Sequence, residues 1–524
     1  MAGASAQRNL YGHLAAGFAA RPNAVALEVP GGPRMTYREL DRAAGRWAAA
    51  LRGLGLAPGA RVAVQVEKSP EAVLLHLALL RAGLVHLPLN PAYRPAELEH
   101  FLTDARPQAL VCDPAREEAL APLARGAGVA HILTLDAAGR GSLPERAAAA
   151  PRPLPTEPRA ADDPAAILYT SGTTGPPKGA VITHGNLVAN ARALERAWGW
   201  REDDVLVHAL PLFHVHGLFV ACHLALRGSR LRLLPRFDPE AVVRAFAGAS
   251  VFMGVPTHYA RLLACGRLTR EACAGMRLFV SGSAPLPERV FAAFHERTGH
   301  AILERYGMTE IGMALSNPLA GPRLPGTVGV PLPGVEVRIV DARGLPAADG
   351  KTGELQVRGP SVFAGYWNAP ERTAAAFAAD GWFRTGDLAR RDPASGHYAI
   401  VGRLRALIVT GGYKVQPEEV ERHLEALPGV AESAVFGVPH PEWGEAVTAA
   451  VVPQAGARLE EAALRGALRE RLAPYKVPKR ILVVETLPRN AMGKVQRRRL
   501  AERHRALYGG EGAPLRCRST RSSR

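Results

Sequence analysis

The stretch that decides the fold is Tyr169-Thr170-Ser171-Gly172-Thr173-Thr174-Gly175-Pro176-Pro177-Lys178-Gly179. It combines hydroxyl side chains, glycines and one lysine. Glycines let backbone N–H groups approach an anion, hydroxyl groups add donors, and Lys178 adds positive charge. A Walker A loop would continue from its lysine through Ser or Thr into a helix. Here Gly179 and the strand-like AVITH follow. The stretch therefore predicts a phosphate-binding loop between two strands.

The hydrophobic pattern on both sides of this loop predicts an α/β fold. Residues 1–140 alternate helical and strand-like segments, including an amphipathic helix over 36–55. A second α/β pattern runs to about residue 320, and residues 325–400 are rich in Gly and Pro with short strands. We expect a large N-terminal domain of layered α/β subdomains plus a β-rich subdomain over residues 1–404.

A smaller unit is predicted to follow. From about residue 406 the order helix, strand, strand, helix, strand is typical of a compact α+β domain, which we assign to residues 405–510. Residues 511–524 are expected to be a disordered, Arg-rich tail. Residues 140–163, rich in Ala, Pro and Arg, are expected to be an exposed connector. A chain of 524 residues is too long for one hydrophobic core, so two or more domains are expected.

Composition excludes several classes of protein. The net charge of +17 would suit nucleic acid, but arginine is spread along the whole chain without an aromatic-interleaved basic motif. We expect no nucleic-acid partner, although a basic field favours small anionic ligands. No run of about eighteen apolar residues predicts a membrane span. Five scattered cysteines and a start without a secretory pattern favour reduced thiols in the cytoplasm.

Seven further segments follow the loop: HALPLFHVHGL, VSGSAPLP, ERYGMTE, GELQVRGPSVFAGYW, GWFRTGDLA, GRLRALIVTGGYKV and PRNAMGKVQ. Together with the loop, and in this order over residues 165–497, they resemble the adenylate-forming superfamily of acyl-CoA synthetases, adenylation domains and luciferases. One glycine motif alone would be weak, whereas eight in order are very specific. The resemblance implies an ATP-dependent acid–thiol ligase that forms an acyl-adenylate and passes the acyl group to coenzyme A.

The resemblance also implies a site for ATP and Mg²⁺. Glu310 would hold Mg²⁺, a hard cation that prefers oxygen ligands, Thr309 would contact phosphate, and Tyr306 would lie on adenine. Asp387 would accept both ribose hydroxyls, as an acceptor-only carboxylate can, and Arg403 would be its ribose and phosphate partner. The other residues placed around the nucleotide are Thr170, Ser171, Gly172, Thr173, Thr174, Gly175, Lys178, Gly282, Ser283, Ala284, Glu304, Arg305 and Gly307.

The small domain is expected to be mobile. The family lysine that matches Lys494 swings onto the acid and the α-phosphate, where a positioned cation stabilises the charge of the transition state. A hinge rotation would then bring a glycine turn to the thiol arm of coenzyme A. The usual Lys-Asp hinge is replaced here by Arg405 and Ala406, which leaves the hinge position open. The residues expected to line the pantetheine tunnel are Gly411, Gly412 and Lys414.

The acid is predicted from residues near the expected acyl pocket. His214 and His216 suit a short polar acid better than a long apolar chain, and Arg236 could pair bidentately with a second carboxylate. Arg236 is also consistent with a surface position, and His216 with a core histidine. The segments HALPLFHVHGLFVA, FMGVPTHYARLL and LERYGMTEIGMALSNPL resemble malonyl-CoA synthetases, which implies malonate, with methylmalonate as a second candidate. Ser281 and Met308 complete the predicted acid site.

Rival functions remain open. The nearest is another short- or medium-chain acyl-CoA synthetase for a monocarboxylate, followed by a stand-alone adenylation enzyme that loads a carrier protein. A non-catalytic nucleotide sensor is disfavoured because Lys494, Glu310 and Asp387 are all retained. The residues predicted to be catalytic are Lys494, Thr309, Glu310 and His214, and the expected role is in fatty acid metabolism.

Overall fold

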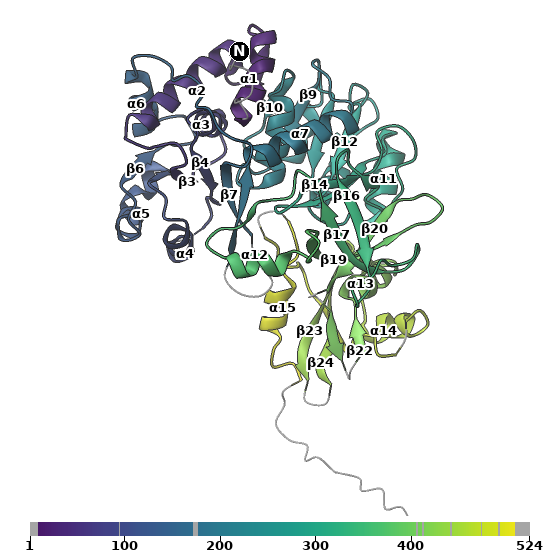
Figure 1. The fold of residues 1–524 in the computed structure, drawn as a ribbon. Coiled ribbons are helices and arrows are strands. Elements are labelled where there is room, and N and C mark those ends of the chain that lie inside the picture. Colours follow the sequence, from purple (N-terminus) through teal and green to yellow (C-terminus); the bar gives the residue numbers. More distant parts are fainter. Residues whose placement is uncertain are drawn as a thin grey trace, which may run out of the picture. The chain divides into compact units, whose positions relative to one another are not determined.

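The computed structural model describes residues 9–93, 95–170, 177–404, 407–410, 413–440, 443–472, 474–490 and 493–508 (Figure 1). The chain divides into two compact units, residues 1–385 with 389–400, and residues 386–388 with 401–524. Some predictions fall outside the described residues: those for Ser171, Gly172, Thr173, Thr174, Gly175, Arg405, Ala406, Gly411, Gly412 and the tail over 511–524.

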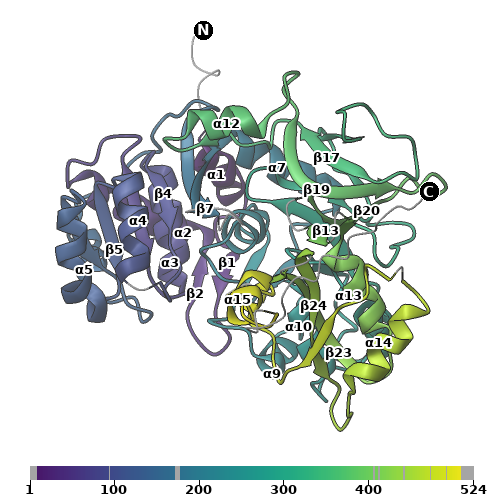
Figure 2. The same cartoon turned by 90° about the horizontal axis from the view of Figure 1, so that it is seen from below.

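One sheet of the first unit carries the strands on either side of the predicted phosphate loop. Helices flank the parallel part of this sheet, and two of them begin at N-capping residues that are recognisable in the sequence. Ser69 caps α3 (Pro70–Arg81) through Ala72 N–H, and Thr36 forms a capping box with Glu39 at the start of α2 (Tyr37–Arg52). Figure 2 shows α3, α4 (Pro95–Ala105) and α5 (Pro114–Gly126) packed alongside β4 (Val85–Pro88) and β5 (Ala109–Cys112). The described strands run in the order β18 (Gly365–Tyr366), β8 (Lys178–Thr183), β7 (Pro164–Thr170), β4 (Val85–Pro88), β3 (Arg61–Gln65), β5 (Ala109–Cys112), β6 (His131–Thr134). The helices are α2 (Tyr37–Arg52), α3 (Pro70–Arg81), α4 (Pro95–Ala105), α5 (Pro114–Gly126) and α6 (Ser142–Ala149).

The second sheet supplies most of the candidate site. Its central strands are parallel, so their carboxyl ends meet at one edge of the sheet, where ligands bind in open α/β folds. The described order is β15 (Val330–Pro331), β14 (Gly312–Ser316), β13 (Leu303–Met308), β12 (Leu278–Ser281), β11 (Val251–Gly254), β9 (Val205–His208), β10 (Arg230–Leu233), β1 (Val25–Glu28), β2 (Arg34–Thr36). The helices of this region are α1 (Leu10–Ala20), α7 (His184–Ala197), the π-helix η1 (Val215–Cys222), α8 (His223–Ala225), α9 (Pro239–Arg244), α10 (Pro256–Leu263) and α11 (Glu288–Thr298).

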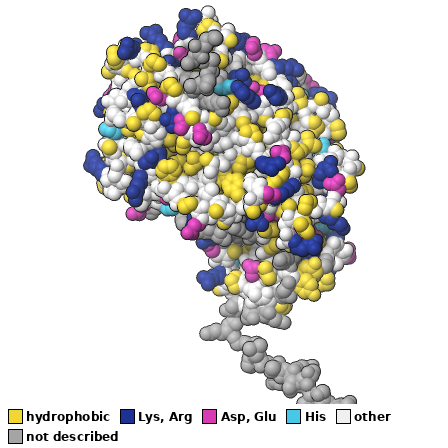
Figure 3. Space-filling model, viewed as in Figure 1, with side chains coloured by type: hydrophobic (Ala, Val, Ile, Leu, Met, Phe, Trp, Pro, Cys, Tyr) yellow, Lys and Arg dark blue, Asp and Glu magenta, His cyan; other side chains and the backbone are white. Residues whose placement is uncertain are grey.

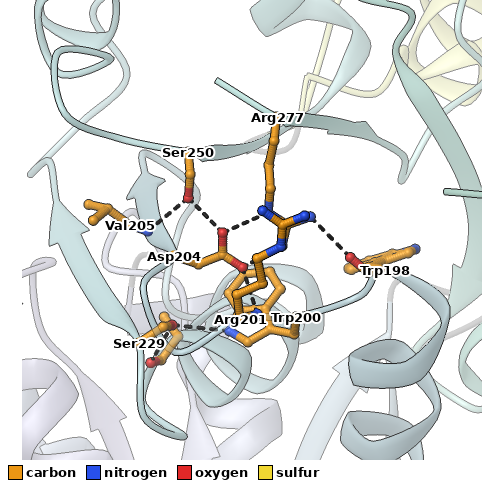
Figure 4. Close-up of polar contacts among 9 residues, drawn as sticks. Trp198, Trp200, Arg201, Asp204, Val205, Ser229, Ser250 and Arg277 are labelled. Carbon is orange, nitrogen blue, oxygen red and sulfur yellow. Dashed lines mark hydrogen bonds and ion pairs between the residues drawn. The ribbon is translucent and has the colours of Figure 1, made fainter. Parts of the chain in front are cut away.

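A polar cluster ties together the amino ends of these strands (Figure 4). Asp204, which is 2% exposed, precedes β9 and pairs with the guanidinium of Arg277, whose Nε lies 2.7 Å from Asp204 Oδ1. The Ser250 hydroxyl donates to the same carboxylate at 2.7 Å and accepts from Val205 N–H at 2.9 Å. Three segments that lead into neighbouring strands are therefore fixed at the edge opposite the carboxyl ends.

The first unit ends in a β-rich part. Its strands β16 (Glu336–Val340), β17 (Gly353–Arg358), β19 (Phe383–Arg391) and β20 (Tyr398–Arg403) form one sheet in that order, and α12 (Pro370–Ala376) precedes β19. Residues 386–388 of β19 and 401–403 of β20 belong to the second unit by their contacts.

The second unit is a five-stranded sheet with three described helices. Apolar residues of β23 and β24 pack with those of α13 and α14, so this unit has a core of its own, which includes Val420, Leu424, Val447 and Leu468. The strands are β21 (Ile408–Thr410), β22 (Tyr413–Val415), β23 (Val430–His440), β24 (Gly444–Pro453) and β25 (Arg480–Val483). The helices are α13 (Pro417–Glu425), α14 (Glu461–Arg469) and α15 (Arg497–Arg503).

The predicted α/β class is confirmed, and so is the position of the loop between two strands. Strands β7 and β8 pair antiparallel with Thr170 opposite Lys178. The connector predicted over residues 140–163 is wrong in its first half. There α6 buries Leu143 and Ala147 and packs on α2, because two apolar residues four positions apart share one helix face.

The surface carries charges of both signs. On the face drawn in Figure 3, Lys and Arg side chains are scattered among neutral and acidic ones and do not form one continuous patch. No helix in the described ranges is long and apolar enough to cross a membrane.

Candidate active site

Strand β13 sends consecutive side chains to opposite faces, which separates two ionisable groups that are neighbours in sequence. The Glu304 carboxylate accepts a hydrogen bond from Leu286 N–H at 2.9 Å, so it supports the loop after β12. Burial raises the pKa of Glu304 to about 8, despite the opposing charge of Arg305. Glu304 therefore binds a proton more readily than an ordinary carboxyl group, which weakens it as a counter-charge for Arg305.

Arg305 is the most unusual group of the site. It is 2% exposed, and its Nε and Nη2 atoms have no hydrogen-bond partner among the described residues. Its guanidinium lies over Gly282, where an added Cβ would stand 2.4 Å from Arg305 Cζ. Burial lowers the pKa of Arg305 to about 9, so it stays charged at neutral pH. A buried charge without a partner is costly, and an anionic ligand would remove that cost.

Two histidine-bearing segments face the same region. His216 lies in η1, is 1% exposed, and its Nδ1 is 3.3 Å from the Ser283 hydroxyl oxygen. Burial, and then Arg305, lower the pKa of His216 well below its usual value, so the ring is neutral. Ser283 has a positive φ of 71°, a strained conformation that is frequent at binding sites. As at Arg305, buried polar atoms here lack a hydrogen-bond partner among the described residues, and they include His216 Nε2 and Ser281 Oγ.

Strand β9 adds a histidine that sequence reasoning missed. His208 Nε2 donates to the Gly217 carbonyl at 2.8 Å, and Lys68 Nζ donates to the His208 carbonyl at 2.9 Å. His208 and His258 both act electrostatically on His216. Both histidines lie at or just after the carboxyl end of a parallel strand, and this position is the feature that could have identified them. Sequence alone does not reveal which strands are neighbours in the sheet.

The side of the site that is predicted to bind phosphate includes residues on or next to β8, β13 and β18. The Tyr366 hydroxyl and the Glu310 carboxylate are 3.0 Å apart, and Glu310 is 5% exposed. The Lys178 ammonium lies 5.0 Å from the centroid of the Tyr366 ring. Tyr306, Met308 and Thr309 are half-buried at the end of β13. At Gly307 an added Cβ would stand 2.1 Å from the Gly312 carbonyl oxygen, so only glycine fits this hairpin.

The second unit holds the other predicted nucleotide residues. Asp387 is 3% exposed and pairs with Arg403, whose Nε is 2.8 Å from Asp387 Oδ1. Burial lowers the pKa of Lys494 to about 8 although the residue keeps contact with solvent, and the charges of Arg403 and Asp387 then act on it in opposite directions. Asn490 holds the turn before Lys494, since its Oδ1 accepts from Lys494 N–H at 2.9 Å. Lys414 lies in β22, and its side chain is outside the described set.

Arg236 is not brought into the buried cluster. It follows β10 with an exposed side chain. Its neighbour Phe237 stacks on His258 with ring centroids 3.8 Å apart, so the segment borders the site. His214 precedes η1, and burial lowers its pKa to about 4. Ala284 lies in the loop after β12 near Ser283.

Comparison with family models and known proteins defines the class. Residues 14–367 match the model described as AMP-binding enzyme, and residues 419–494 match that of the AMP-binding enzyme C-terminal domain. The first match covers more than half of the chain. The chain therefore belongs to the AMP-binding enzyme family and is an AMP-forming acyl-CoA ligase.

Individual relatives narrow the class further. The mitochondrial malonate–CoA ligase ACSF3 of Mus musculus is 42% identical over 479 residues, which is 84% of this chain and 81% of that protein. The malonate–CoA ligase of Arabidopsis thaliana is 39% identical over 493 residues, 86% of this chain and 78% of that protein. The crystal structure of ATP-bound MatB from Rhodopseudomonas palustris superposes with a TM-score of 0.93 at 47% identity, covering 96% of this chain and all of that one.

Proposed function

We propose that this protein is an ATP-dependent malonate–CoA ligase, which converts malonate, ATP and coenzyme A to malonyl-CoA, AMP and pyrophosphate. The observation that carries the proposal is the buried guanidinium of Arg305, without a hydrogen-bonded counter-ion in the described protein, beside Ser281 and His216. The second carboxylate of malonate would supply that charge and accept paired hydrogen bonds. The names of the similar proteins, malonate–CoA ligases, support the same acid.

The reaction has two balanced steps. A carboxylate oxygen attacks the α-phosphorus of ATP and pyrophosphate leaves, and then the thiolate of coenzyme A attacks the acyl carbon and AMP leaves. Lys178 and the predicted loop would hold phosphates, and Lys494 would offset charge at the reacting carboxylate. Glu310, a buried carboxylate beside Tyr366, fits Mg²⁺, which would neutralise phosphate charge when bound.

The rival readings predict a different pocket. A monocarboxylate would leave Arg305 buried and unpaired, which costs free energy that malonate avoids. Methylmalonate keeps both carboxylates and adds one methyl group, so we propose it as a weaker second substrate. An enzyme that loads a carrier protein would release AMP when the carrier-protein thiol, rather than coenzyme A, accepts the acyl group.

The test is pyrophosphate release with acetate, propionate, malonate, methylmalonate and octanoate, each with and without coenzyme A. We expect the highest kcat/KM with malonate and a value at least ~10²-fold lower with propionate, because propionate lacks the charged group that the site is built to bind. Equal rates with propionate and malonate would refute the dicarboxylate assignment. Turnover that requires an added carrier-protein thiol, and that coenzyme A does not support, would favour carrier loading.

We further propose that the enzyme acts in the cytoplasm and supplies malonyl-CoA to fatty acid metabolism. Among the described residues, the cysteines are buried and free, as expected under reducing conditions: Cys112, Cys222, Cys265 and Cys273. Cell fractionation with a C-terminally tagged protein tests the location, and recovery in an organelle fraction would overturn it.

A further inference from the structure

Three buried histidines outside the acyl pocket form a continuous row. His76 of α3, His86 of β4 and His223 of α8 are 0%, 3% and 1% exposed. The Nδ1 atoms of His76 and His86 are 2.9 Å apart, and the Nε2 atoms of His76 and His223 are also 2.9 Å apart. The imidazole of His76, on α3, therefore connects β4 through His86 and α8 through His223.

The row requires neutral rings with ordered tautomers. Each 2.9 Å contact needs one N–H donor and one bare nitrogen, so the protons must all point the same way along the row. Burial lowers the pKa of His86 and of His223 to about 3. Burial, followed by both neighbouring imidazoles, lowers the pKa of His76 well below its usual value. The titratable group that acts on the row from α1 is His13.

The row ends on the element that carries the acyl-pocket histidines. The π-helix η1 runs from Val215 to Cys222, directly into His223. Such helices are rare, frequently mark functional sites, and need support from their surroundings. Near its start, η1 is held by His208, which donates to the Gly217 carbonyl, and by a backbone approach that leaves no room for a Cβ at Gly217.

We propose that the row His86–His76–His223 is a positioning device, which fixes η1 and thereby holds His214 and His216 against the acid substrate. The identity of that acid rests on the proposed function. Apolar side chains could fill the same space, but their packing is not directional, whereas the paired hydrogen bonds select one placement of the helix. His76 is a positioning residue, since its ring nitrogens bond only to other row members.

The row itself is tested by nitrogen-15 NMR of the histidine side chains in the full-length protein, without substrate. We expect the three row imidazoles to be neutral, each as a single tautomer, from pH 6 to pH 8. Titration of any of them with an ordinary pKa of about 6.5 would overturn the proposal. This readout does not depend on which acid the enzyme uses.

The positioning role is tested with His76→Leu and the conservative His76→Gln. Leu should raise the KM for malonate about tenfold or more and leave the KM for ATP within about twofold, and Gln should restore part of the loss. The matched control is His300→Leu, which removes a 3.2 Å hydrogen bond between His300 Nε2 and the Cys273 carbonyl away from η1.

The outcomes separate a structural role from a positioning role. Equal loss of melting temperature in His76→Leu and His300→Leu, with a malonate KM raised only in the first, supports the proposal. An unchanged malonate KM in a folded His76→Leu or His76→Gln variant refutes it. If propionate or another acid proves to be the substrate, the proposed function fails, and the KM of that acid replaces malonate in the same comparison.

Discussion

At the residue scale, two arginines are candidates for binding the second carboxylate of the acid. The resemblance assigned Arg305 to the nucleotide, and the fold places its guanidinium over Gly282, where it adds to the effect of burial in lowering the pKa of His216. Arg236, the cation predicted for the acid, is exposed. The two arginines can therefore be compared directly as anchors of the second carboxylate.

The first prediction concerns these arginines. Arg305→Met should lower kcat/KM for malonate roughly 10- to 150-fold. This corresponds to the loss of about 1.5–3 kcal/mol of binding free energy, the usual contribution of a hydrogen bond to a charged group. Propionate, which has no second carboxylate, should be affected far less. Pyrophosphate release at varied acid and ATP concentrations measures both effects.

Two further variants check the cause. Gly282→Ala should reproduce part of the Arg305→Met defect, because the added Cβ would stand 2.4 Å from Arg305 Cζ and displace the guanidinium. Arg236→Ala should raise the KM for malonate only if that exposed side chain also reaches the substrate. A malonate defect in Arg236→Ala but not in Arg305→Met would reverse our assignment.

The second prediction concerns Lys494. Lys494→Gln should slow malonyl-AMP formation by about 10²- to 10³-fold, the effect of removing one group that stabilises charge in the transition state. Exchange of labelled pyrophosphate into ATP measures this step. The melting temperature should not change, because the side chain is exposed. Lys479→Gln, which removes an ammonium 4.7 Å from the Trp443 ring centroid, is the matched control and should keep the exchange rate.

At the scale of elements, the two edges of the large sheet differ in how fully their polar side chains are hydrogen-bonded. The carboxyl edge collects His208, Ser281 and Arg305, which lack internal partners for some polar atoms. At the amino edge, Asp204 and Arg277 are joined by internal hydrogen bonds (Figure 4). Hydrogen-bonded polar groups thus gather at the amino edge, and buried polar atoms without a partner gather at the carboxyl edge. This is expected if the carboxyl edge binds a ligand.

The third prediction follows from the amino edge. Burial alone would raise the pKa of Asp204, but hydrogen bonds from Arg277 and Ser250 reverse this and lower it, so the carboxylate is charged. Asp204→Ala should destabilise the first unit by about 3 kcal/mol, since it leaves the Arg277 charge without its partner. Thermal unfolding measures the loss. Asp204→Ala combined with Arg277→Met should lose less than Asp204→Ala alone, and additive losses would argue against the pair.

At the scale of the whole molecule, neutral buried histidines should make the protein sensitive to acid. Burial lowers the pKa of these side chains to about 3 or 4: His13, His86, His184, His214, His223 and His258. The unfolded chain binds protons at these groups near pH 6.5, and the folded chain does not. Stability should therefore fall as the pH drops from about 6.5 toward 4.

The fourth prediction concerns how steeply stability falls with decreasing pH and how Glu304 opposes this fall. Each fully neutral histidine contributes up to about 1.4 kcal/mol of lost stability per pH unit in that window. Glu304 acts in the opposite direction, because its raised folded pKa favours the folded state below about pH 4.5 and loses that contribution as the pH rises toward 8. The melting temperature should thus be highest near neutral pH. A melting temperature that is flat between pH 6.5 and 4.5 would contradict the neutral histidines.

Much of the fold was predictable because its signals are local. The amphipathic pattern of α2, the capping Ser69 of α3 and the hairpin of β7 and β8 each lie within one short segment. Helix α6 was missed because its composition, rich in Ala, Pro and Arg, matches that of an exposed connector. The π-helix η1 was also missed, since its irregular hydrogen bonds depend on support from His208.

Sequence by itself determined the α/β class, the place of the predicted phosphate loop between two strands and the adenylate-forming family, because each is carried by residues adjacent in the chain. Tertiary structure alone decided what Arg305 and the histidine row face. Ser281 pairs with Glu304 across β12 and β13, and this register sets Gly282 beside Arg305. Strand order and register depend on contacts between segments that are far apart in the sequence. The spacing of residues within one segment therefore does not predict that Gly282 will lie beside the guanidinium of Arg305.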